Sequence, residues 1–194
     1  MFIRLKKVKK RNGKVYEYAH LVRGVWRRKR LRREGEGKKS FVGYNNSVHK
    51  YSGFIGRVHR FDKIKEKLNS DKFFDGEFKN FVNCSEIENI YEKLIEYELL
   101  SRGFIKRGKV LNSGNIFVDL NRKIVHDGNS DVVIKLKDFG GYLCSLNLDE
   151  LFSIKNIQNK QDGIYLMKKL RQNGINLKPD EFYLLAEKML KTGE

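Results

Sequence analysis

The chain has 194 residues, of which 40% are hydrophobic, so it can bury the core of one large domain or two small ones. A mean hydropathy of -0.60 and the lack of any apolar run of bilayer length exclude a transmembrane-helix protein. The net charge of +17 excludes a surface on which acidic and basic groups balance.

The excess positive charge lies in the first third of the chain. Residues 1–60 hold 19 Lys and Arg but three acidic residues, a net charge of +16, whereas residues 61–194 hold 22 basic and 21 acidic residues. Because the rest of the chain has no acid to spare, we expect a partner to supply the anion, and a nucleic-acid backbone is the commonest one. A solvated surface without a ligand is the alternative. An anionic membrane would call for an amphipathic helical pattern, which this region lacks.

Residues 1–60 are predicted to form a small antiparallel β-sheet. FIRLKKV alternates loosely, and Asn12-Gly13 is typical of a type I′ hairpin turn. KVYEYAHLV supplies the next strand, Gly24 marks a second turn, and VWRRKRL would return as a third strand. Cations occupy both faces of that third strand, which is typical of an edge or a protruding ribbon and not of a core strand.

This arginine-rich ribbon is the predicted contact with nucleic acid, because the planar guanidinium fork suits phosphate oxygens and guanine edges. Further along, Tyr44, Tyr51 and Phe54 alternate with cations, so that rings could stack on bases while cations hold phosphates. The alternative for these rings is a core strand with basic flanks. The predicted contact residues are Trp26, Arg27, Arg28, Lys29, Arg30, Arg32, Arg33, Lys38, Lys39, Tyr44, Lys50, Arg57 and Arg60. Trp26 would anchor the ribbon to the core or stack on the ligand.

Residues 61–194 are predicted to form a second domain that mixes helices and strands. Ser85 and Glu88 suggest a capping box at the start of a long helix, which ends near Gly103. NIFVDL, KIVHD and DVVIKL are predicted strands, a short helix is capped by Asn147, and Pro179 opens the last helix. The predicted fold class is therefore α+β: a small N-terminal antiparallel β-sheet with a basic ribbon (1–60), then an α+β domain (61–194) that ends in helices and serves dimerisation or protein contacts.

The sequence shows no strong signal for catalysis, a cofactor or a metal. P-loop, GxGxxG and GxSxG motifs are absent, and Cys84 and Cys144 stand alone, as free thiols do in a reducing cytosol. No ligand spacing links the four histidines, His20, His49, His59 and His126. The sequence therefore predicts a non-catalytic protein without a metal or cofactor.

A metal-dependent nuclease is the weaker alternative. Asp119, Asp127 and Asp131, with Lys135 nearby, partly match the carboxylates and lysine of such sites. Lys135 follows Asp131 by four residues and not by the two that the pattern requires, and Asp127 lies in a predicted turn, where aspartates serve local hydrogen bonds.

The stretch KVYEYAHLVRGVWRRKRLRREGEGKKSFVG, residues 14–43, runs from aromatic and aliphatic residues through a Leu-Val pair and a basic stretch to a Val-Gly end. The residues that carry this pattern are Lys14, Tyr16, Tyr18, Leu21, Val22, Trp26, Arg27, Val42 and Gly43. The stretch resembles the N-terminal segment of some insertion-sequence transposases. The resemblance covers about 30 of the 194 residues, and the family's large catalytic domain with three metal-binding carboxylates would not fit in the remainder. It implies a DNA-contacting module without transposase chemistry.

These observations together predict a non-catalytic nucleic-acid-binding protein of the cytoplasm, associated with the nucleoid or the ribosome. Double-stranded DNA bound by the ribbon in a chromatin or regulatory role is the first hypothesis, since phosphate contacts supply much of the affinity of such proteins. A ribosome-associated or other RNA-binding protein is the alternative, because charge does not separate DNA from RNA. A homodimer would fit DNA with two half-sites.

Overall fold

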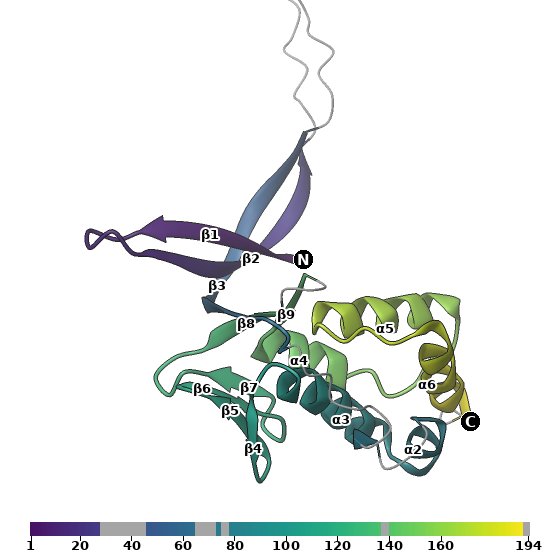
Figure 1. Ribbon diagram of the computed structural model, residues 1–194. Coiled ribbons are helices and arrows are strands. Elements are labelled where there is room, and N and C mark those ends of the chain that lie inside the picture. The colour runs from purple at the N-terminus through teal and green to yellow at the C-terminus, as the bar shows by residue number, and fades with distance from the viewer. Residues whose placement is uncertain (28–45, 65–72, 75–77, 137–139, 192–194) are drawn as a thin grey trace, which may run out of the picture. The chain divides into compact units, whose positions relative to one another are not determined.

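The computed structural model describes residues 1–27, 46–64, 73–74, 78–136 and 140–191 (Figure 1). The chain divides into two compact units, Met1–Ile55 and Gly56–Glu194, here called the N-terminal unit and the C-terminal unit. The division falls within strand β3 (Asn46–Phe61), five residues before the boundary expected from the change in composition. The fold class is α+β, as predicted: an antiparallel sheet comes first and the chain ends in helices.

The N-terminal unit is built on a long hairpin of strands β1 (Phe2–Lys9) and β2 (Val15–Arg27), with the first part of β3 beside β2. The two hairpin strands pair antiparallel from Phe2 opposite Val22 to Lys9 opposite Val15, which confirms the predicted hairpin (Figure 1). β3 continues past the unit boundary and ends in the C-terminal unit.

The hairpin turn is not of the predicted type I′. That turn needs a positive φ at both central residues, whereas Gly13 has φ 77° and Asn12 has no positive φ. The Gly13 N–H donates to the Lys10 carbonyl, and the Lys10 N–H donates to the Lys14 carbonyl. This pattern belongs to a three-residue loop in which a type I turn is followed by a left-handed glycine.

The second turn predicted at Gly24 is wrong, because β2 continues through this residue to Arg27. The β-branched Val22 and Val25 on either side favour a strand, and their preference outweighs the single glycine. The third strand therefore begins at Asn46 and not at Val25. Residues 28–45, which would form most of the predicted ribbon, lie outside the described part of the chain.

Two groups of strands form the β part of the C-terminal unit. The last residues of β3 pair parallel with β8 (Val132–Leu136), which pairs antiparallel with β9 (Gly141–Leu143). The other group is an antiparallel meander in the order β4-β5-β6-β7, formed by Ile105–Arg107, Val110–Ser113, Ile116–Asp119 and Ile124–His126. Strands β4 and β5 were not predicted, because they are short and their apolar residues are interrupted and flanked by lysine, arginine and glycine.

Five helices of the C-terminal unit are described: α2 (Phe78–Cys84), α3 (Ile87–Leu100), α4 (Ser145–Phe152), α5 (Lys160–Gln172) and α6 (Pro179–Lys191). The apolar stripe of α3 is buried as predicted, and Pro179 opens α6 as predicted. Gly103, with φ 81°, ends α3 in a Schellman arrangement: its N–H donates to the Leu100 carbonyl, and the Phe104 N–H donates to the Leu99 carbonyl.

The two N-cap residues predicted for α3 and α4 are wrong. The N-cap of α3 is Glu86 and not Ser85, and it makes no side-chain cap bond. Asn147 lies inside α4, where its amide donates to the Tyr142 carbonyl at 2.6 Å. The capping box of α5 is present, with Asn159 as the N-cap and Asp162 as its partner three residues on.

The core of the C-terminal unit centres on α3. Ile90, Tyr91 and Leu99 are fully buried among residues of the strands and of the other helices. The Tyr91 hydroxyl donates to the Ile154 carbonyl at 3.0 Å, and burial raises the pKa of this phenol well above its usual value. The aromatic Phe74 packs on Tyr97 with a ring separation of 5.7 Å, so it belongs to this core. No helix in the described residues is both long and apolar enough to cross a membrane.

Candidate nucleic-acid interface

The predicted contact residues are only partly described. Trp26 and Arg27 are the last two residues of β2, and nothing is described of their side chains. The predicted residues outside the described part of the chain are Arg28, Lys29, Arg30, Arg32, Arg33, Lys38, Lys39 and Tyr44. Lys50, Arg57 and Arg60 are exposed on β3, the first in the N-terminal unit and the other two in the C-terminal unit.

The register of the hairpin separates its side chains into two chemically different faces. Successive residues of a strand point to opposite sides, so the pairs Arg4–His20 and Lys6–Tyr18 lie on one side of the hairpin. The side chains of this side are Phe2, Arg4, Lys6, Val8, Tyr16, Tyr18, His20 and Val22. The other side carries the aliphatic residues Ile3, Leu5, Ala19 and Leu21, followed toward the turn by Lys7, Lys9, Val15 and Glu17. We call the first side the aromatic face.

Three rings of strand β3, those of His49, Tyr51 and Phe54, contact rings of the aromatic face. The His20 ring contacts Tyr51 and Phe54 with both ring separations at 5.6 Å, and Tyr18 contacts Phe54 at 6.0 Å. Phe2 meets His49 edge-on at 5.0 Å. The contacts run in opposite order along the two strands, as they do across an antiparallel pair.

Cations border these rings. Arg4 and Lys6 are exposed and lie directly opposite His20 and Tyr18, the residues that contact the β3 rings. Nearer the turn, the Lys10 ammonium lies 4.9 Å above the Tyr16 ring, at the range of a cation–π contact. Positive groups therefore lie along β1, at one edge of the aromatic face.

The acidic residue that is described in this unit lies on the opposite face. Glu17 is the one acidic residue in the described stretches 1–27 and 46–55. It stands opposite Lys7 in the hairpin register, and its carboxylate lies 3.8 Å from the Lys7 ammonium. The positive potential of the aromatic face is therefore not offset by a carboxylate on that face in the described residues.

The rings of β3 remain open to solvent. Tyr51 is 64% exposed and Phe54 is 58% exposed, while His20, which contacts both, is half-buried. Exposed aromatic groups beside cations can stack on planar ligands and hold anions at the same time. The sequence alone did not identify Phe2, Arg4 or Lys6 as candidates. These residues are spaced by two along β1, and this spacing places them on one face only once the register of the hairpin is known.

Two of the three carboxylates of the nuclease alternative, those of Asp119 and Asp127, have local roles. The Asp119 carboxylate accepts the Arg122 N–H at 3.0 Å within a turn. Asp127 accepts the backbone N–H groups of Asn129 and Ser130, and these bonds lower its pKa below the usual range. Among the described residues, no cluster of three or more His, Cys, Asp or Glu side chains is arranged to hold a metal ion.

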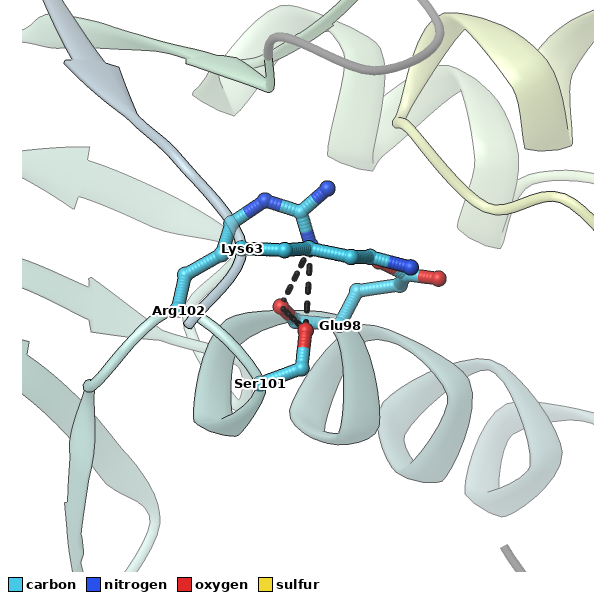
Figure 2. Close-up of polar contacts among 4 residues, drawn as sticks. All are labelled: Lys63, Glu98, Ser101 and Arg102. Carbon is cyan, nitrogen blue, oxygen red and sulfur yellow. Dashed lines mark hydrogen bonds and ion pairs between the residues drawn. The ribbon is translucent and has the colours of Figure 1, made fainter. Parts of the chain in front are cut away.

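A buried ion-pair cluster in the C-terminal unit also has a structural role (Figure 2). The Glu98 carboxylate accepts a hydrogen bond from the Arg102 guanidinium and lies 3.6 Å from the Lys63 ammonium. The Ser101 hydroxyl donates to the Glu98 carbonyl at 2.8 Å, and the Ile64 N–H donates to the Ser101 carbonyl at 3.0 Å. The cluster thus ties the residues after β3 to the C-terminal end of α3, where cations are favoured by the helix dipole.

Comparisons of the chain with models of protein families, with curated proteins and with solved structures give no match. The resemblance of residues 14–43 to transposase segments therefore stays a prediction.

Proposed function

We propose that this protein is a non-catalytic nucleic-acid-binding protein and that its N-terminal unit carries the binding surface. The observation behind this proposal is the aromatic face, where Arg4 and Lys6 lie beside exposed rings and the unit's described acid points to the other side. Phosphate oxygens are the anions that such a surface would meet along a whole row of cations.

The arginine-rich stretch supports the same function from the sequence. Residues 25–34 hold six cations that the near-neutral remainder of the chain does not balance. Double-stranded DNA is the first candidate for this stretch, since arginine reads both phosphates and guanine edges. RNA, including ribosomal RNA, is the alternative, because both backbones carry the same charge. Under either ligand, the C-terminal unit would serve protein contacts or dimerisation.

The proposal is tested by binding of the full chain to duplex DNA, single-stranded DNA and duplex RNA over a salt series from about 50 to 300 mM. The informative variant is the double substitution Arg4→Gln with Lys6→Gln, which removes two exposed cations from the aromatic face. The matched control is Lys160→Gln with Lys168→Gln, which removes two exposed cations from α5 in the C-terminal unit.

If Arg4 and Lys6 contact phosphates, the double variant lowers the slope of log affinity against log salt by roughly one per lost contact. The control variant should keep the wild-type slope, although it loses the same charge. Equal slopes for the two double variants would refute the placement of binding on this face. No measurable binding of any oligonucleotide at the lowest salt would refute the proposed function as a whole.

A further inference from the structure

Tyr51 and Phe54 are exposed to an extent that the fold does not require. Both rings contact the shared neighbour His20 with ring separations of 5.6 Å, Phe54 also contacts Tyr18, and both residues remain more than half exposed. Aromatic side chains commonly gain stability by burial, so two neighbouring open rings on a sheet mark a surface that can accept a partner.

The cations beside the rings indicate the chemistry of that partner. Arg4 and Lys6 stand on β1, while Tyr51 and Phe54 stand on β3, with β2 between them. Neighbouring strands are about 4.8 Å apart, so the row of cations and the row of rings are separated by about 10 Å. A nucleotide can bridge rows so spaced, with its planar base on a ring and its phosphate near a cation.

The rings also distinguish between forms of nucleic acid. In a duplex the faces of the bases are covered by their neighbours, and a protein reaches base edges and phosphates in the grooves. Unpaired bases expose their faces, and aromatic side chains bind them by stacking with little dependence on sequence. Rings that are open on a sheet face are therefore of use for a single strand and of little use for a duplex.

We infer that Tyr51 and Phe54 are a stacking platform for the unpaired bases of single-stranded nucleic acid, with Arg4 and Lys6 holding its phosphates. This inference rests on the proposed function and deepens it, because it assigns a ligand form to one face of the N-terminal unit. It is separate from the contact expected of the arginine-rich stretch with duplex DNA.

The test compares Tyr51→Leu with Phe54→Leu, alone and combined, against wild type in the full chain. Leucine keeps an apolar group on the strand and the net charge, but it removes the planar ring. The control is Tyr183→Leu on α6, which changes a tyrosine that is 67% exposed in the C-terminal unit. The probes are unstructured DNA and RNA single strands of about 12 nucleotides and a duplex of the same length, with far-UV circular dichroism to check the fold.

Loss of one stacked base should lower single-strand affinity roughly 5- to 150-fold for each ring that is removed. The salt slope should stay as in wild type, since no charge is lost, and duplex binding and the Tyr183→Leu control should not change. Wild-type single-strand affinity in the folded double variant would overturn the inference. An equal loss for single strand and duplex would also overturn it, and neither result would touch the phosphate contacts tested by the Arg4 and Lys6 variant.

A direct readout comes from single strands that carry iodouridine. Ultraviolet crosslinking should attach them to the peptide that contains Tyr51 and Phe54, because the photoexcited iodouracil reacts efficiently with an aromatic ring stacked on it. Crosslinks confined to other peptides, with binding intact, would overturn the platform while leaving the proposed function standing. Absence of binding by wild type to every oligonucleotide would instead remove the proposed function and the platform together.

Discussion

Gly56 allows a close approach between β3 and Asp131, the residue before β8, and its replacement gives a sharp test of the fold. A Cβ atom at this position would lie 2.3 Å from the Asp131 carbonyl oxygen and 2.8 Å from the Asp131 carbonyl carbon. Ordinary van der Waals contact begins near 3.4 Å, so the strands would have to separate by about 1.1 Å. The next residue, Arg57, pairs with Val132 in the parallel ladder, which opposes that movement.

Overpacking against backbone that cannot yield costs about 1–3 kcal/mol, so Gly56→Ala should lower the free energy of unfolding of the C-terminal unit by this amount. With a denaturant slope of about 2 kcal/mol/M, a loss of 2 kcal/mol moves the urea midpoint down by about 1 M. Far-UV circular dichroism is the suitable measurement, because all the described helices lie in the C-terminal unit and report its unfolding.

Gly53→Ala is the matched control on the same strand. A Cβ atom at Gly53 meets nothing within 4 Å, and its φ is not positive. Alanine should therefore change stability by less than about 0.5 kcal/mol, or raise it slightly by restricting the unfolded chain. If Gly56→Ala and Gly53→Ala unfold at the same urea concentration, the pairing of β3 with β8 is not as close as described here and the reasoning fails.

The two cysteines should differ in reactivity: Cys84 is exposed, whereas Cys144 is buried and burial raises the pKa of its thiol to about 11. A thiol reagent should modify Cys84 at once and Cys144 only after unfolding, and rapid modification of both in the native state would contradict the burial. Burial and the neighbouring Arg57 lower the pKa of His59 below its ordinary 6.5, against an opposing effect of Asp127. As the pH falls, the unfolded chain therefore binds a proton at His59 at a higher pH than the native chain does. The contribution of neutral His59 to the free energy of unfolding is fully present above about pH 6.5 and is lost as the pH falls toward the native pKa. Urea midpoints from about pH 7 to about pH 5 should decline less in His59→Gln than in wild type, and an equal decline would refute this linkage.

The sequence predicted the elements whose signals are local and strong. Each of these elements depends on residues within a few positions of one another. They are the hairpin turn at Asn12-Gly13, the apolar stripe of α3, the end of α3 at Gly103 and the start of α6 at Pro179. The errors arose where several local signals compete. Gly24 favours a turn, but the valines around it favour a strand, and the strand continues. Ser85 is a common N-cap residue, but the N-cap of α3 is the next residue, Glu86, and the helix begins at Ile87.

The candidate site was harder to predict because it depends on register. Tyr51 and Phe54 were noted from their spacing with cations, but their neighbours Tyr18 and His20 come from another strand. A prediction of these contacts needs the pairing of β2 with β3 across a connection of 18 residues outside the described part of the chain. The parallel pairing of β3 with β8 was missed for a similar reason, since more than seventy residues separate Arg57 from Val132.

The composition of the aromatic face argues against two other uses of its open rings. A fold that needed these positions only as strand would be served by threonine or valine, which favour strands without leaving large rings in water. Self-association through this face would bring Arg4 and Lys6 of one copy against the same cations of another, and like charges placed together oppose such contact. A polyanion relieves that repulsion and covers the rings in a single event. Open rings paired with cations that no carboxylate of the described residues offsets on that face are therefore more consistent with a nucleic-acid strand than with a core or a self-complementary interface.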